Sequence, residues 1–218
     1  MYSNYLAKVL CLDKVILSKM NQEQILQACR DYIHNHFSGE GTGHDFFHVE
    51  RVVKTARKIA EIEKVDLFLV EIAALLHDTG DYKLHGGKDK SEELISEFLT
   101  SLNLETELIA KVIEIVSQVS FSKGNHATTK EAQIVQDADR LDALGAIGIA
   151  RCFAYGGKKQ REIWNPDNPE ATSLQHFYDK LLKLKDLMNT SSAQEIAEER
   201  HRFLNEFLTQ FYKEWEGS

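Results

Sequence analysis

The stretch Phe68-Leu69-Val70-Glu71-Ile72-Ala73-Ala74-Leu75-Leu76-His77-Asp78 is nearly all apolar until its last two residues. Apart from Glu71, it presents apolar side chains in every direction, as a helix that is buried on most sides does. The helix is expected to end at His77-Asp78-Thr79-Gly80, with Gly80 as its C-terminal stop. Burial of an ionised carboxylate is costly unless it is paired or binds a metal, so the dipeptide indicates either a ligand pair or a helix end open to water.

The segments on both sides of this stretch also have helical spacing. Val49, Val52, Val53, Ala56 and Ala60 recur at the intervals of one helix face. Further helices are expected over residues 21–37, 91–102 (with Ser91 as N-cap), 104–119, 130–155, 174–184 and 196–215. Since no segment has a convincing strand pattern, the sequence predicts an all-α fold. We expect a single domain over residues 20–218, and residues 1–19 as an N-terminal extension that is either an appendage or the product of an upstream start.

Composition and charge restrict the partners. The chain of 218 residues has a formal net charge of -8, which disfavours binding to a nucleic-acid polymer. The three cysteines, Cys11, Cys29 and Cys152, have no metal-type spacing, and their odd number argues against a disulfide framework. No apolar run is long enough to span a bilayer, and no export signal is evident. The sequence therefore predicts a cytoplasmic protein that does not bind membranes.

Two further elements carry groups with metal-binding chemistry. His48 is one helical turn before Val52, at the edge of an apolar stripe, where it is either a packed core histidine or a ligand. Asp137, Asp139 and Asp142 precede an apolar segment. Asp139 and Asp142 share one helical face and Asp137 is turned away from it. The alternative to metal binding is that these aspartates form a carboxylate cluster in the first turns of a helix, where the helix dipole favours negative charge.

Taken together, these elements follow the order H…HD…D. In this order the sequence resembles members of the HD superfamily. The resemblance implies an all-α core that holds a divalent metal through His48, His77, Asp78 and Asp139, with Asp142 supporting a ligand. A closer likeness, to a bacterial branch of small HD hydrolases similar to nucleotide pyrophosphohydrolases, is carried by these motifs: His-Asp-Phe-Phe-His-x-x-Arg-Val (44–52), Leu-Leu-His-Asp (75–78), Ser-Phe-Ser-Lys-Gly (120–124), Asp-Ala-Asp-Arg-Leu-Asp-Ala-Leu-Gly-Ala-Ile-Gly-Ile-Ala-Arg (137–151) and Phe-Ala-Tyr-Gly-Gly (153–157).

The mixed nitrogen and oxygen ligand set suits Mn²⁺, Fe²⁺, Co²⁺, Ni²⁺ or Zn²⁺, and ligand type alone does not choose among them. Mn²⁺ is our first expectation, with Mg²⁺, Co²⁺, Ni²⁺, Fe²⁺ and Zn²⁺ as alternatives. A divalent ion would lower the pKa of bound water for attack on phosphorus. Asp81 lies three residues after Asp78 and is a candidate to orient that water or take its proton. The alternative, given equal weight, is that Asp81 is an exposed loop residue without a catalytic role. The candidates for substrate binding fall within or beside the motifs: Arg51, Lys83, Lys123, Arg140, Arg151 and His44.

The function expected from this resemblance is hydrolysis of small phosphorylated compounds, nucleotides foremost, with release of pyrophosphate or phosphate. Two alternatives stay open: a di-iron oxygenase of HD type, and a non-catalytic nucleotide-binding module. His85 and His126 lie between the HD doublet and the last aspartate, but their spacing is not a clean match to a two-metal site, so one ion is favoured. The apolar faces of the last two helices allow either a monomer or a homodimer.

Overall fold

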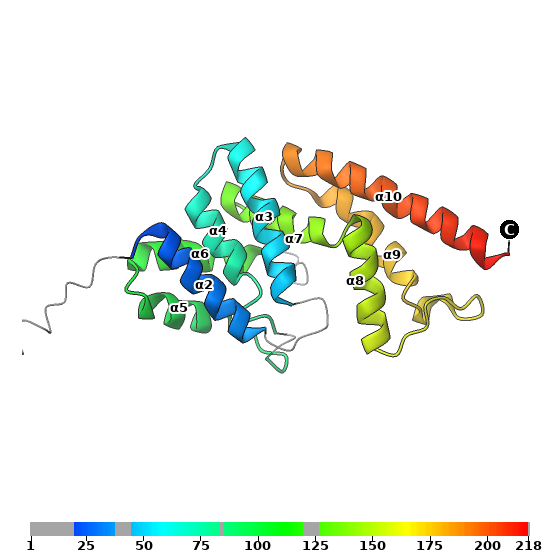
Figure 1. Cartoon of the computed structure of the whole chain (residues 1–218), viewed down its shortest axis with the longest axis horizontal. Helices are drawn as coiled ribbons and strands as arrows, with labels where there is room; N and C mark the ends of the chain where they lie inside the picture. Colours follow the sequence, from blue (N-terminus) through cyan, green and yellow to red (C-terminus); the bar gives the residue numbers. More distant parts are fainter. Residues whose placement is uncertain (1–19, 38–44, 83–84, 120–126, 218) are drawn as a thin grey trace, which may run out of the picture.

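The computed structural model describes residues 20–37, 45–82, 85–119 and 127–217. These residues contain no strand, so the predicted all-α fold class is confirmed. No helix in these ranges is both long and apolar enough to cross a membrane. The helices follow one another as Figure 1 shows: α2 (Gln22–His36), α3 (Phe46–Glu63), α4 (Leu67–Leu76), α5 (Ser91–Ser101), α6 (Thr106–Val119), α7 (Lys130–Asp142), α8 (Gly145–Lys158), η2 (Pro169–Ala171), α9 (Gln175–Asp179), η3 (Leu181–Leu187) and α10 (Ser191–Trp215).

Short polar side chains fix where several of these helices begin. Asn21 and Gln24 form a reciprocal capping box at α2, with both hydrogen bonds at 2.9 Å. The Oδ1 of Asp45 accepts a hydrogen bond from the backbone N–H of His48 at 2.7 Å, which starts α3. Asp66 starts α4 in the same way. The capping of α3 therefore determines where the chain becomes helical just before a candidate metal ligand.

The apolar helix α4 lies in the centre of the core. Its residues from Leu69 to Leu76 are buried, as its composition predicts. It packs against α2, α3, α6 and α7, and α3 in turn packs against α7. The H…HD…D residues lie at the beginning of α3, directly after the end of α4 and in the third turn of α7, so this packing brings the motif together.

The C-terminal helices extend the molecule on the other side of α7. Figure 1 shows α8, α9 and α10 on the side of α7 that is opposite to α2 and α5. Phe177 of α9 stacks on Phe207 of α10, with ring centroids 5.6 Å apart, and Phe153 of α8 lies within 6.0 Å of both rings. Much of the apolar surface of the last helices is thus used within the chain.

Two predicted helices are interrupted in the structure. The segment expected as one helix over residues 130–155 is two helices, because the chain leaves α7 after Asp142, becomes extended at Leu144, and starts α8 at Gly145 with a left-handed φ of +67°. The close packing expected of the glycines is confirmed at Gly148, where a Cβ atom would lie 2.2 Å from the carbonyl oxygen of Ala143. The helix expected over residues 174–184 is also broken, at Lys180, into α9 and the 3-10 helix η3.

Two terminal residues have different roles from those predicted. α4 ends at Leu76, before Gly80, and Gly80 is needed for close packing, because its Cβ would lie 2.1 Å from the backbone nitrogen of Ser91. Ser91 is the first residue of α5 rather than its N-cap, and its backbone N–H donates to Oδ1 of Asp89 at 2.9 Å. The turn after the candidate ligands thus packs directly against the start of α5.

Candidate metal centre

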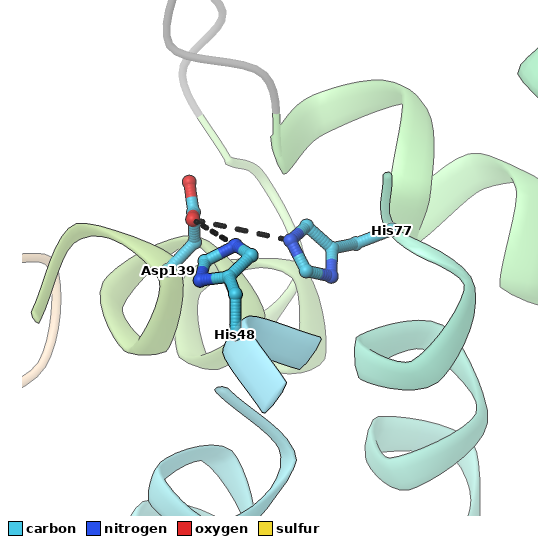
Figure 2. A group of neighbouring side chains, drawn as sticks. All are labelled: His48, His77 and Asp139. Carbon is cyan, nitrogen blue, oxygen red and sulfur yellow. Dashed lines mark ion pairs between the residues drawn. The ribbon is translucent and has the colours of Figure 1, made fainter. Parts of the chain in front are cut away.

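Three helices converge on one cluster of imidazoles and carboxylates. His48 comes from the first turn of α3, His77 and Asp78 follow the last residue of α4, and Asp139 lies in the third turn of α7. Figure 2 shows the two imidazole rings and the Asp139 carboxylate facing one another. Donor atoms of His48, His77 and Asp139 all lie within 4.8 Å of one another, as the ligands of one ion would.

The distances within the cluster fit a shared cation. The Nε2 of His48 lies 3.4 Å from Oδ1 of Asp139 and 3.5 Å from Oδ2 of Asp78. The Nε2 of His77 lies 3.4 Å from the same Asp78 oxygen and 3.9 Å from Oδ1 of Asp139. These separations exceed ordinary hydrogen bonds and suit two ligands whose bonds to one ion are each about 2.1 Å.

His77 is oriented by the helix that it follows. Its Nδ1 lies 2.7 Å from the carbonyl oxygen of Ala74, so Nδ1 carries the proton and donates it there. The opposite ring nitrogen, Nε2, is buried and makes no hydrogen bond within the described part of the chain. A buried polar atom without such a bond is costly, and a metal ion would satisfy it.

His48 is oriented by a carboxylate. Its Nδ1 donates to Oδ2 of Asp142 at 2.7 Å, which leaves Nε2 directed to Asp78 and Asp139. Asp142 is in turn held by two arginines. Arg51 donates from Nε at 2.7 Å and from Nη2 at 3.0 Å, and Arg151 donates from Nη1 at 2.8 Å. A carboxylate behind a histidine ligand is the usual arrangement that fixes its tautomer and raises its basicity.

The charges show that the cluster favours a cation. Burial alone would lower the pKa of His48, but the neighbouring carboxylates of Asp139, Asp142 and Asp78 outweigh burial and raise that pKa to about 10. Burial alone would raise the pKa of Asp139, but the neighbouring imidazoles of His48 and His77 lower it to about 2. The carboxylates therefore stabilise positive charge at this point of the molecule.

Comparison with known proteins gives the family. Residues 45–144 match the HD domain. The protein YpgQ of Bacillus subtilis (strain 168) is 40% identical over 202 residues, which cover 91% of this chain and 97% of that protein. The chain belongs to the HD superfamily. All four residues of the H…HD…D pattern lie inside the matched HD domain.

Solved structures of HD relatives share the fold over nearly their whole length. An HD-superfamily hydrolase from Bacillus thuringiensis is 42% identical, with a TM-score of 0.77 and coverage of 91% of this chain and 100% of that one. A crystal structure of Bacillus subtilis YpgQ in complex with ADP is 37% identical, with a TM-score of 0.75 and coverage of 87% and 97%. These likenesses support a hydrolase.

The structure distributes the other predicted site residues unevenly around the HD cluster. Arg51 and Arg151 meet at Asp142, one contact away from His48. Arg140, by contrast, donates to the carbonyl oxygen of Leu187, so its guanidinium lies against the C-terminal segment. Asp81 is half-buried in the turn after α4, where its backbone N–H donates to the carbonyl of Asp78 at 3.2 Å.

Three predicted substrate contacts, His44, Lys83 and Lys123, lie outside the described residues, as does His126. His85 is described, and its Nε2 lies 3.1 Å from the carbonyl oxygen of Thr79. Within the described ranges, the cluster of His48, His77 and Asp139 is the only group of three or more such side chains with metal-binding spacing. The described residues thus offer one candidate metal site.

Asp137 has a structural role that its position in the Asp137–Asp142 cluster does not predict. Its carboxylate is fully buried and accepts hydrogen bonds from the backbone N–H and side chain of both Asn189 and Thr190, at 2.8–2.9 Å. Thr190 is the N-cap of α10, so Asp137 joins the helix that carries Asp139 to the C-terminal helix. A usable signal was present, because Asp137 lies on the apolar face defined by Ile134 and Leu141.

Proposed function

We propose that this protein is a metal-dependent phosphohydrolase that acts on small phosphorylated compounds, with nucleotides as the substrate class. The observation that carries the proposal is the orientation of His48 and His77. Each ring donates its Nδ1–H away from the cluster, so that both Nε2 atoms face the carboxylates of Asp78 and Asp139. Two imidazoles and two carboxylates arranged in this way suit a divalent ion.

We assign the metal ligands to His48, His77, Asp78 and Asp139. We expect Mn²⁺ first, although ligands of this nitrogen and oxygen type also accept Co²⁺, Ni²⁺, Fe²⁺ and Zn²⁺, and Mg²⁺ is a further alternative. A bound divalent ion supplies an activated water and neutralises phosphoryl charge. The sequence neighbour Asp81 is our candidate to hold that water or accept its proton, since it belongs to the turn that carries His77 and Asp78.

Phosphate groups need cations near the metal ligands. We assign this role first to Arg51 and Arg151, whose guanidinium groups lie beside Asp142 and remain partly exposed. His44, Lys83 and Lys123 belong to the proposal on the strength of sequence alone. The contact of Arg140 with Leu187 gives its proposed phosphate contact no support. The substrate class draws support from the ADP that the relative YpgQ binds.

The test is turnover by protein that has been stripped of metal and reloaded with one ion at a time. Mn²⁺, Mg²⁺, Co²⁺ and Zn²⁺ forms are assayed against nucleoside mono-, di- and triphosphates, with pyrophosphate and phosphate separated. We expect metal-dependent turnover that is lost in His77→Ala and Asp139→Ala. His34→Ala and Asp186→Ala, which change exposed residues of the same types, are the matched controls and should keep full activity.

Other outcomes would support the remaining functions. Two irons per chain, together with oxidation of a substrate by O₂, would favour the oxygenase. Tight nucleotide binding without turnover under any metal would favour the binding module. Either result, with a folded and metal-loaded protein, would overturn the phosphohydrolase proposal.

A further inference from the structure

The turn that carries His77 and Asp78 follows the last residue of α4, where backbone carbonyl groups no longer have partners within the helix. Local bonds shape part of this turn. The backbone N–H of Thr79 donates to the carbonyl oxygen of Leu76 at 3.1 Å, and that of Asp81 donates to the carbonyl oxygen of Asp78 at 3.2 Å. Thr79 is fully buried, so its own carbonyl group also needs a hydrogen-bond donor.

Two histidine side chains bond to the backbone of Thr79. The Nε2 of His85 lies 3.1 Å from its carbonyl oxygen and donates to it. Burial and the neighbouring His85 lower the pKa of His36, whereas a hydrogen bond to the Thr79 backbone raises it, as a bond from a ring N–H to a carbonyl oxygen does. The centres of the two imidazole rings are 6.0 Å apart. One carbonyl group is thus held by a ring from the last turn of α2 and by a ring from the segment after the HD doublet.

The ring of His36 is itself held in place by aromatic contacts. Tyr32 precedes His36 by one turn of α2, and the two rings stack with their centroids 5.9 Å apart. The other neighbour of the Tyr32 ring is Phe98 of α5, with stacked rings at 4.0 Å. The start of α5 also touches the turn, because the backbone N–H of Lys90 donates to the carbonyl oxygen of Gly80 at 3.0 Å. The stacked rings therefore join α2 to α5 beside the turn.

The restraint on Thr79 acts one residue away from a proposed metal ligand. The Oδ2 of Asp78 lies 3.5 Å from Nε2 of His48 and 3.4 Å from Nε2 of His77. A change in the backbone next to Asp78 would move its carboxylate relative to both imidazoles. Metal ligands must keep their positions to within about 0.5 Å for productive binding. A turn that is free to rotate would therefore weaken the site.

We propose that His36 and His85 are positioning residues of the metal centre, which hold the Thr79 carbonyl group and thereby keep Asp78 within reach of the ion. The inference rests on the proposed function, because it takes Asp78 as a metal ligand. His85 acts on the site through the backbone and not as the ligand of a second metal. His36 lies outside residues 45–144, the part of the chain that matches the HD domain, so the first helix contributes to the site from beyond that match.

The experiment measures metal affinity separately from fold stability, in the full chain. Mn²⁺ binding is followed by chelator competition, at a temperature well below the melting temperature of each metal-free variant. We expect His36→Ala and His85→Ala each to weaken Mn²⁺ binding by about three- to tenfold, the range that one hydrogen bond contributes. His85→Gln, whose amide keeps an N–H donor near the position of Nε2, should stay within about twofold of wild type.

His34→Ala is the matched control, because His34 is an exposed histidine in the same last turn of α2, and it should also stay within about twofold. Unchanged affinity in either folded alanine variant would overturn the positioning role, as would equal losses in His85→Gln and His85→Ala. Loss of binding in Asp139→Ala shows that the measured ion occupies the proposed site, so a failure of the positioning role alone is recognised. Wild type that binds no Mn²⁺ would overturn the proposed metal centre as well.

Discussion

The Nδ1 of His48 donates a 2.7 Å hydrogen bond to Oδ2 of Asp142, which aims the opposite ring nitrogen at Asp78 and Asp139. Burial would raise the pKa of Asp142, but its hydrogen bonds to His48 and Arg51 and the nearby charge of Arg151 hold that pKa well below its usual range. The carboxylate therefore stays ionised and keeps the proton of His48 on Nδ1. Asp142 thus orients the His48 ring, but it is not itself one of the proposed metal ligands.

Asp142→Asn should weaken metal binding. The amide keeps the size of the side chain but removes the negative charge that fixes the His48 tautomer and compensates Arg51 and Arg151. Loss of a partner of this kind commonly costs about 10- to 100-fold in metal affinity. A chelator-competition titration with Mn²⁺ measures it, with exposed Asp186→Asn as the matched control. An unchanged dissociation constant in a folded variant would contradict the assigned role.

Asp137→Ala should destabilise the fold. The change leaves the buried donors of Asn189 and Thr190 without their acceptor, and the N-terminus of α10 loses its attachment to α7. We expect the free energy of unfolding to fall by about 3–5 kcal/mol, as when one partner of a buried charged network is removed. Urea denaturation gives the value. Asp167→Ala, at an exposed aspartate, should stay within about 0.5 kcal/mol of wild type.

The loss of stability in Asp137→Ala should also be localised to one part of the chain. Amide hydrogen exchange in Asp137→Ala is expected to rise at the first turn of α10 more than in α4, since the lost hydrogen bonds join Asp137 to Asn189 and to Thr190, the N-cap of α10. A uniform rise over the whole chain would show instead that the network supports global stability without a specific link to α10.

The sequence was informative where periodicity and chemistry agree. The apolar run from Phe68 to Leu76 predicts a buried helix, and the following histidine and aspartate predict polar groups at its buried end. The HD pattern predicts His48, His77 and Asp139 in one cluster, which the distances now give. These features are local or belong to a pattern, so a single sequence contains them.

The partners of Asp137 and Arg140 depended on chain topology. Asp137 meets residues 189–190, and Arg140 meets the carbonyl of Leu187, across the loop and helices that separate them. The break between α7 and α8 was missed because a helical pattern of apolar residues continues through it, whereas the extended Leu144 and the left-handed φ of Gly145 are properties of the packed backbone. The helical spacing indicates that Asp137 is buried, but it does not identify the distant residues that it contacts.

Gly148→Ala and Gly157→Ala make the same chemical change in one helix with opposite expected results. At Gly148 the new Cβ would lie 2.2 Å from the carbonyl oxygen of Ala143, so the junction of α7 and α8 must shift. We expect a loss of about 1–3 kcal/mol in the free energy of unfolding. At Gly157 no atom lies within 4 Å of the new Cβ, and the better helix propensity of alanine should add up to about 1 kcal/mol. Denaturant unfolding of both variants tests the pair, and equal losses would contradict the packing described at Gly148.

Metal removal should lower thermal stability, because the folded chain alone assembles residues from α3, α4 and α7 into one site. At a free Mn²⁺ concentration one hundred times the dissociation constant, binding adds about 2.7 kcal/mol, which raises the melting temperature of a chain of this size by about 5–10 °C. Scanning fluorimetry with Mn²⁺ and then with excess chelator measures the shift. His77→Ala should lose most of it, since we propose the buried Nε2 of His77, which makes no hydrogen bond within the described residues, as a metal ligand. His34→Ala should retain it. An equal shift in wild type and His77→Ala would mean that Mn²⁺ binds elsewhere, and the assignment of the cluster as the metal site would fail.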